Sequence, residues 1–245
     1  YLVLATKSGL VKKTPLEMYN SPRSGGIIAV NLREDEEGKP DELVSAQLAN
    51  ADDDLLLVSR DGQAVRFAAT DEQLRPMGRS TSGVRGMKFR GDDELLTMDV
   101  PREGTDLLIV TDSGYAKRTP IEEYPTKGRR TMGVRVGRLV EERGGLVGAL
   151  VVDPEEDIMV ITESGKLVQV NASDVRPTAR NTMGVIFARP EENDRIMAVT
   201  RNPERDIDEE ESEDAQAQDN SSQSNDETPA EDVASEHDDS QEVQE

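Results

Sequence analysis

The sequence predicts an all-β protein, a propeller-type array of four-stranded blades. An apolar strand, a Ser-Gly or Asp-Gly turn, a second strand and an Arg-containing segment leading to another glycine recur four times in 245 residues. The turn glycines lie 53, 52 and 51 residues apart, and β-branched residues are frequent while helical periodicity is scarce. A period near 50 is typical of arrays in which each unit buries its apolar surface against its neighbours. We therefore expect the function on a surface that the repeats build together.

Two sets of glycines mark the repeats, and we interpret both as structural. The turn glycines, which supply the positive φ of a tight hairpin turn, are Gly9, Gly62, Gly114 and Gly165. The second glycines are Gly26, Gly83, Gly133 and Gly184. In the last three repeats the second glycine ends an Arg-x-x-x-Gly-Val string, whereas the first repeat reads Arg23-Ser24-Gly25-Gly26-Ile27.

The second repeat shows the expected elements most clearly. It contains four apolar or alternating runs separated by turn residues, and we expect strands at 55–59, 64–67, 83–89 and 95–100. Several strands are apolar at consecutive positions, which is expected when neighbouring blades cover both faces of a sheet. Four such strands in about 50 residues describe one propeller blade.

A short helical turn is expected after the second strand of three repeats. Each candidate has the Thr-x-x-Glu/Gln pattern of a capping box, and two have proline at the first helical position. The three candidates are Thr14–Glu17, Thr70–Gln73 and Thr119–Glu122.

The repeats and the charge divide the chain into two parts. The predicted blades cover about 1–53, 54–105, 106–156 and 157–204. Residues 206–245 hold 17 Asp and Glu and no Lys or Arg, so the net charge of −22 falls to −5 without them. We expect 205–245 to be a disordered acidic tail, because it has too few apolar residues to offset its ordering entropy. Since a ring usually needs more than four blades and the chain starts within a strand pattern, we expect it to be a fragment.

Cations gather in equivalent stretches of the repeats, which we call the basic segments: 75–90, 127–138 and 176–189. The first two contain five Lys or Arg each and no acid, and acids gather instead at 34–37, 92–94, 153–157 and 191–194. A repeat fold places equivalent segments equivalently, so one band of the perimeter should be basic and another acidic. A basic band suits the phosphates of duplex DNA, and the seven aromatic residues are too few for a platform that stacks single-stranded bases.

The residues exclude several kinds of site. The chain has no cysteine, and its one histidine, His237, lies in the acidic stretch, so neither a His-based triad nor a His or Cys metal cluster is expected. No Gly-x-x-x-x-Gly-Lys phosphate loop and no apolar run of membrane-spanning length occurs. We expect no catalytic residue, no metal, no cofactor and no membrane contact in this chain.

The motifs resemble those of the family of C-terminal domains found in the DNA gyrase A subunit, over about residues 1–204. The strings that carry the resemblance are Gly9-Leu10-Val11-Lys12-Lys13-Thr14, Tyr115-Ala116-Lys117-Arg118-Thr119-Pro120 and Arg180-Asn181-Thr182-Met183-Gly184-Val185. The acidic tail is also a feature of that family.

The resemblance implies a six-bladed β-pinwheel, of which four blades are present here, with strands exchanged between neighbouring blades. It implies a domain that wraps duplex DNA with positive handedness within an A2B2 gyrase, an ATP-dependent type II topoisomerase of the bacterial cytoplasm and nucleoid. ATP and Mg²⁺ would belong to the gyrase B protein, and the rest of the gyrase A protein would be a further partner.

Charge and resemblance together suggest the DNA-binding residues. The candidates are Lys12, Lys13, Arg23, Arg66, Arg79, Arg85, Lys117, Arg118, Arg129, Arg130, Arg135 and Arg180.

Two departures from the family pattern limit the inference. The Gln-Arg-Arg-Gly-Gly-type box of the family's first blade does not occur, and the family's DNA-linking tyrosine lies in the N-terminal half. Tyr1, Tyr19, Tyr115 and Tyr124 lie in no matching motif. The chain should therefore bind and bend DNA without cleaving or supercoiling it.

Alternatives stay open at this point. One is the homologous domain of topoisomerase IV, whose blades are generally more degenerate. A second is a propeller scaffold for protein partners, although that class predicts Trp-containing signatures and the chain has no Trp. The acidic tail is either a solubilising end or an electrostatic competitor for the basic surface.

Overall fold

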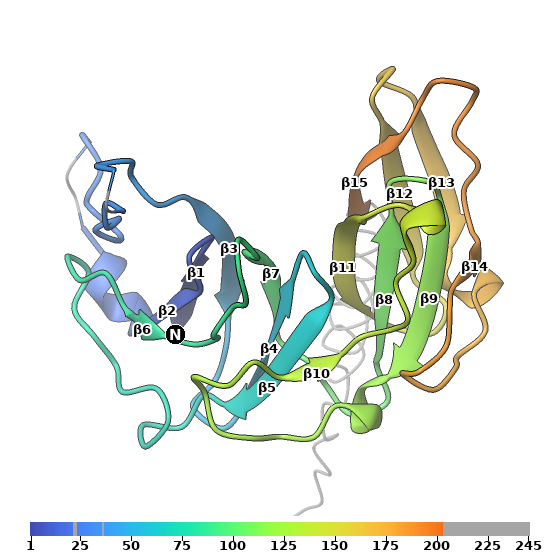
Figure 1. Cartoon of the computed structure of the whole chain (residues 1–245). Helices are drawn as coiled ribbons and strands as arrows, with labels where there is room; N and C mark the ends of the chain where they lie inside the picture. The colour runs from blue at the N-terminus through green and yellow to red at the C-terminus, as the bar shows by residue number, and fades with distance from the viewer. Residues whose placement is uncertain (22–23, 36, 203–245) are drawn as a thin grey trace, which may run out of the picture. The chain divides into compact units, whose positions relative to one another are not determined.

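The computed structural model describes residues 1–21, 24–35 and 37–202, and Tyr1–Asn202 form one compact unit. Its regular elements are β-strands and short 3₁₀ helices, which confirms the all-β prediction. The strands form four consecutive antiparallel sheets (Figure 1). The predicted acidic tail, 205–245, lies outside the described residues.

Three of the sheets have four strands, and each draws its strands from two repeats. The first has the order β3 (Leu43–Leu48), β1 (Leu2–Thr6), β2 (Leu10–Thr14), β6 (Val84–Arg85). The second has the order β10 (Val134–Arg135), β5 (Gln63–Ala68), β4 (Asp54–Ser59), β7 (Leu95–Asp99). The third has the order β11 (Leu146–Val152), β8 (Asp106–Thr111), β9 (Tyr115–Pro120), β14 (Val185–Ile186).

The fourth sheet has three strands among the described residues. Their order is β13 (Leu167–Asn171), β12 (Asp157–Thr162), β15 (Ile196–Arg201). In the first three sheets the fourth strand comes from the following repeat, so β13 occupies the place to which such a strand would be added.

Strand exchange is the feature that joins one sheet to the next. β6 pairs with β2, β10 with β5 and β14 with β9, all antiparallel (Figure 1). The exchanged strand is shorter than the predicted 83–89, because the chain leaves the ladder after Arg85. There the Gly86 amide donates to the Gly9 carbonyl at 2.9 Å, and Met87 then forms a parallel bridge with Thr131 of the next repeat.

The central strands are buried on both faces, as their unbroken apolar runs predict. In β4 the side chains alternate between two cores. Leu55 and Leu57 pack in a cluster with Val3, whereas Leu56 packs with Leu107 in the next cluster. The β4–β5 hairpin therefore separates two cores, and the β8–β9 hairpin does the same, with Leu107 in the second cluster and Leu108 in the third.

The predicted helical turns form in two of the three places, but their caps differ from the prediction. The 3₁₀ helices η1 (Leu16–Tyr19) and η2 (Ile121–Glu123) follow Pro15 and Pro120, which are the cap residues and have extended ψ angles of 135° and 138°. Neither helix has a side-chain cap hydrogen bond. Thr14 continues the strand, and its hydroxyl is buried without a hydrogen-bond partner. Thr70 begins only a hydrogen-bonded turn.

Two further 3₁₀ helices are present in the described residues. η3 (Glu141–Arg143) lies in the connection before β11, and η4 (Ala172–Asp174) follows β13. Of the four, only η4 has a side-chain cap, in which Asn171 accepts from the Ser173 amide at 2.9 Å.

The second glycines allow the exchanged strands to approach the preceding sheet closely. A Cβ atom built on Gly83, Gly133 or Gly184 would lie 2.6, 2.0 or 2.4 Å from a carbonyl oxygen of the preceding hairpin. Those oxygens belong to Val11, Ala64 and Ala116, each two residues after a turn glycine. A side chain at these positions would collide with backbone, so glycine is the residue that permits the exchange.

Candidate nucleic-acid interface

The predicted DNA-binding cations occupy two different environments. Five lie on the return strands of the hairpins, and six of the others lie on the basic segments. Arg23 falls on residues that the structure does not describe. The return strands that carry these five residues, β2, β5 and β9, lie in the interior of their sheets.

In the first three repeats, the cation at the fourth position after the turn glycine forms an ion pair within the protein. Lys13 is fully buried, donates from Nζ to the Asp71 carboxylate at 2.8 Å and lies 4.7 Å from the Tyr1 ring centroid. Arg66 pairs with Asp54 at 2.7 Å and donates to the Ile121 carbonyl of the next repeat at 3.1 Å.

Arg118, at the same position of the third repeat, forms an equally internal pair. Its Nε lies 3.3 Å from Asp106, and its Nη1 donates to the Pro154 carbonyl at 2.7 Å. Burial raises the pKa of Asp106, and the attraction of Arg118 offsets only part of that rise. The guanidinium is thus held inside the protein.

Lys12 and Lys117, at the third position after the turn glycine, are also buried. The Lys12 ammonium donates to the carbonyls of Ala29 and Arg79, and the Lys117 ammonium donates to Thr119 Oγ1 and to the Val136 carbonyl. Burial, with a smaller contribution from nearby Arg180, lowers the pKa of Lys117 to about 8. We find no face of these two lysines that could meet a phosphate.

The basic segments place their cations on the exchanged strands and the connections beside them. Arg85 lies on β6 and Arg135 on β10, each at the edge of its sheet. Both are exposed. The exposed cations of the three segments are Arg75, Arg85, Lys88, Arg90, Lys127, Arg130, Arg135, Arg138, Arg176 and Arg189.

Three predicted residues of the basic segments are half-buried. Arg79, Arg129 and Arg180 each donate a guanidinium hydrogen bond to a backbone carbonyl of the preceding repeat. Burial, together with the neighbouring Arg130, lowers the pKa of Arg129. Their guanidinium groups therefore already have acceptors within the protein.

Arg130 has an unusual backbone for a residue with a side chain. Its φ is 67°, in the left-handed region where a Cβ is unfavourable. Its amide donates to the Gly86 carbonyl at 2.6 Å, which holds this conformation in place. The exposed Arg130 side chain is thus carried by a strained position between the second and third repeats.

In three repeats an aspartate side chain accepts a backbone hydrogen bond from the hairpin turn. Asp41 accepts from the Ser8 amide at 3.0 Å, and Asp194 accepts from the Ser164 amide at 3.1 Å in the fourth repeat. Hydrogen bonds from Ser164 lower the pKa of Asp194 to about 2. In the second repeat, Asp93 accepts from the Asp61 amide at 2.9 Å.

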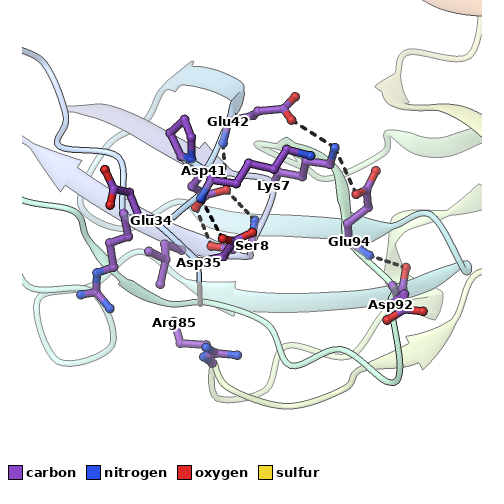
Figure 2. Close-up of a pocket in the computed structure, with 14 residues that line it drawn as sticks. Lys7, Ser8, Glu34, Asp35, Asp41, Glu42, Arg85, Asp92 and Glu94 are labelled. Atoms are coloured by element: carbon purple, nitrogen blue, oxygen red, sulfur yellow. Dashed lines mark hydrogen bonds and ion pairs between the residues drawn. The ribbon is translucent and has the colours of Figure 1, made fainter. Parts of the chain in front are cut away.

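A cavity of about 450 Å³ opens beside the first of these turns. Figure 2 shows Lys7 between Glu42 and Glu94, and Lys7 Nζ lies 3.3 Å from a carboxylate oxygen of each. Arg85 lines the same cavity, so one exposed cation of the basic segments borders the acidic turn. These acids stabilise turns and junctions.

Neither a metal centre nor a membrane segment is seen in the described part of the chain. No group of three or more His, Cys, Asp or Glu side chains there could hold a metal ion. No helix among those residues is long and apolar enough to cross a membrane.

Sequence reasoning identified the basic segments but selected only part of their exposed set. Seven exposed cations of these segments were not among the candidates: Arg75, Lys88, Arg90, Lys127, Arg138, Arg176 and Arg189. The signal that could have found them is their position, because they flank the second glycine in the repeats where the strand is exchanged.

The fold and the cations together define a class: a strand-exchanged propeller array with basic residues on its exchanged edges. Residues 1–50, 53–102, 105–153 and 156–203 match the model of the family described as DNA gyrase C-terminal domain, beta-propeller. The chain belongs to this family.

Similar proteins agree with this assignment. The chain is 54% identical over 204 residues to the DNA gyrase A protein of Streptomyces coelicolor, and likewise to that of Mycobacterium tuberculosis, covering 83% of this chain and 24% of each relative. It thus spans about a quarter of the length of these curated relatives.

Two solved structures share the fold. A DNA gyrase A C-terminal domain has a TM-score of 0.71 at 25% identity, with 82% of this chain and 65% of that chain covered. The C-terminal domain of a DNA topoisomerase IV has a TM-score of 0.74 at 24% identity, with 82% and 61% covered.

Proposed function

We propose that this chain is the part of a gyrase A protein that binds and wraps duplex DNA. The observation that carries the proposal is the repeated exposure of cations on the exchanged edges, with Arg85 on β6 and Arg135 on β10. Equivalent edges of successive sheets offer phosphate contacts at successive places. A duplex that follows them must bend.

Phosphate contacts are the interaction that this surface can supply. Arginine and lysine that neutralise phosphates release condensed counterions, which gives affinity without sequence preference. Bending a stiff duplex costs several kcal/mol per site. Many phosphate contacts of modest strength, spread along the duplex, can offset the cost of bending it. The exposed cations of this chain are spread over three repeats in this way.

The proposed set of DNA-contacting residues differs from the candidates predicted from the sequence. It leaves out the cations of the return strands and adds further exposed cations of the basic segments. It consists of the exposed cations of the basic segments named above, with Arg23 kept from the sequence. We assign Lys12, Lys13, Arg66, Lys117 and Arg118 to holding sheets and repeats together, because their charged groups are bonded inside the protein.

The activity of the whole enzyme is part of the same proposal. The wrapped DNA would present a segment to the remainder of the gyrase A protein, and ATP hydrolysis by the gyrase B protein, with Mg²⁺, would drive negative supercoiling in a bacterial cytoplasm. Identity of 54% to gyrase A proteins supports gyrase over topoisomerase IV. No described tyrosine is proposed to cleave DNA.

The test is binding of the 245-residue chain to a duplex of about 100 base pairs across a salt series, with ligation of a nicked circle in parallel. We expect a steep loss of affinity with salt and a shift in linking number on ligation. A variant with Arg85, Arg130 and Arg135 changed to Gln should lose affinity for every sequence alike. No binding by the unaltered chain would refute the proposal and favour a protein scaffold.

Comparing the whole chain with one ending at Glu204 tests the tail. Equal DNA affinity at low salt would exclude an electrostatic competitor and leave a solubilising end.

A further inference from the structure

Three arginines make the same contact at three successive junctions. Each lies four residues before a second glycine, and its guanidinium donates to the carbonyl of the residue two positions after the second glycine of the preceding repeat. The pairs are Arg79 with Ile28 at 3.2 Å, Arg129 with Arg85 at 3.2 Å and Arg180 with Arg135 at 3.3 Å.

A backbone hydrogen bond accompanies each of these contacts. The amide five residues after one second glycine donates to the threonine carbonyl two residues before the next. The bonds are Asn31 to Thr81 at 3.2 Å, Lys88 to Thr131 at 2.9 Å and Arg138 to Thr182 at 3.0 Å. Each junction between successive edges therefore has two attachment points, one from the backbone and one from an arginine.

At two of the junctions, the carbonyl that accepts the arginine hydrogen bond belongs to an exposed arginine of an edge strand. Arg129 bonds to the carbonyl of Arg85, and Arg180 bonds to the carbonyl of Arg135. Arg129 also donates from Nε to the Gln73 carbonyl, so its rigid, planar guanidinium binds two separate segments of the second repeat. At these two junctions the contact holds an edge strand, β6 or β10, at its exposed arginine, Arg85 or Arg135.

We propose that Arg79, Arg129 and Arg180 are positioning residues that set the path of the bound DNA. By fixing the angle between consecutive edges they determine the linking-number change captured per bound protein, whereas the exposed cations determine affinity. This inference rests on the proposed function. Its physical basis is that a stiff duplex follows the line of its phosphate contacts, and small rotations at each junction add up along that line.

The test compares Arg129 with its neighbour Arg130 in the 245-residue chain. The four variants are Arg129→Lys, Arg129→Gln, Arg130→Lys and Arg130→Gln. Lysine keeps the positive charge but cannot donate to two carbonyls with the geometry of a guanidinium group. The lysine variants therefore show whether the charge alone is enough or the hydrogen-bond geometry is needed. The readouts are the salt dependence of affinity and the linking-number change per bound protein, with thermal unfolding as the check on folding.

We expect both Arg129 variants to lower the linking-number change per bound protein by half or more, with affinity within about threefold of the unaltered chain. Arg130→Gln should instead lower the salt slope by about 0.9, as for one lost phosphate contact, with an unchanged linking number per bound protein. Arg130→Lys keeps the positive charge, so its salt slope should be steeper than that of Arg130→Gln.

An Arg129→Lys variant that captures the normal linking-number change would overturn the inference, because charge alone would then suffice. The inference would also be overturned if Arg129→Gln lowered only the salt dependence of affinity and captured the normal linking-number change. If Arg129→Gln fails to fold, Arg180→Lys supplies the same comparison at the next junction. Absence of DNA binding by the unaltered chain refutes the proposed function itself and is seen before any variant is made.

Discussion

Gly133→Ala is the substitution that tests strand exchange most directly, and Gly26→Ala is its matched control. Both glycines have a φ of 73°, so alanine incurs the same left-handed strain at each, about 1–2 kcal/mol. They differ in surroundings. A Cβ on Gly133 would lie 2.0 Å from the Ala64 carbonyl oxygen, whereas no atom of the described residues lies within 4 Å of a Cβ on Gly26.

The collision adds costs that can be worked out from the structure. Backbone cannot yield as a flexible side chain does, so β10 must move away from β5 and the Val134–Ala64 and Arg135–Gln63 pairings are weakened. Lost backbone hydrogen bonds cost about 0.5–1.5 kcal/mol each, and partial exposure of fully buried Val136 adds about 1–2 kcal/mol. Gly133→Ala should therefore destabilise by about 3–5 kcal/mol, against about 1–2 for Gly26→Ala.

Urea denaturation followed by circular dichroism measures both values, and hydrogen exchange shows where the structure opens. The amide of Val136, which donates to the Gly62 carbonyl at 2.9 Å, should lose protection in Gly133→Ala and keep it in Gly26→Ala. Equal losses of stability in the two variants, within about 0.5 kcal/mol, would refute the reasoning, since strain alone would then account for both.

Three further predictions follow from the buried and strained cations. Because the Lys117 pKa of about 8 is below its usual 10.5, the unfolded chain binds more protons above pH 8. The free energy of unfolding should therefore rise from pH 8 to 10, by about 1–2 kcal/mol more than in Lys117→Met; parallel curves would contradict this. Arg130→Gly should relieve the φ of 67° and raise stability by about 0.5–1 kcal/mol while weakening DNA binding; Arg130→Gln is the control that keeps the strain, and a less stable glycine variant would show that no strain exists. Arg118→Ala leaves Asp106 buried without its partner and should cost about 3–5 kcal/mol in urea denaturation, whereas exposed Arg85→Ala should stay within about 0.5 kcal/mol.

The hairpins were predictable because their signals are local. The run from Leu55 to Ser59 and the turn at Gly62 match β4 and the turn into β5 to within a residue. The spacing could not predict the strand exchange. Val84–Arg85 follows the second glycine directly whether it pairs with the sheet of its own repeat or with that of the preceding repeat. Its partner is decided by packing between repeats, and only the resemblance to a known family implied it.

The basic segments can be identified from the sequence, but which predicted cations are buried cannot. Lys12 and Lys117 looked like surface charges because lysine is rarely buried. The equivalent residue is Val65 in the second repeat, where it is buried, and Val168 in the fourth, where it is exposed on the edge strand β13. Valine at this position was the available sign that the side chain faces the interior in a four-stranded sheet. The Lys12 ammonium binds carbonyls 17 and 67 residues away, and the Lys117 ammonium binds one 19 residues away, and no local pattern shows contacts at such separations.

Strand exchange has a consequence for the order in which the protein is made. The first sheet gains its edge strand from Val84 and Arg85, which leave the ribosome well after the β1–β2 hairpin. At usual rates of synthesis the delay after Thr14 is roughly 4 to 14 s, and each later sheet waits in turn for the following repeat. During translation the growing chain therefore always carries one incomplete sheet, whose open edge moves along the nascent protein until the last repeat emerges.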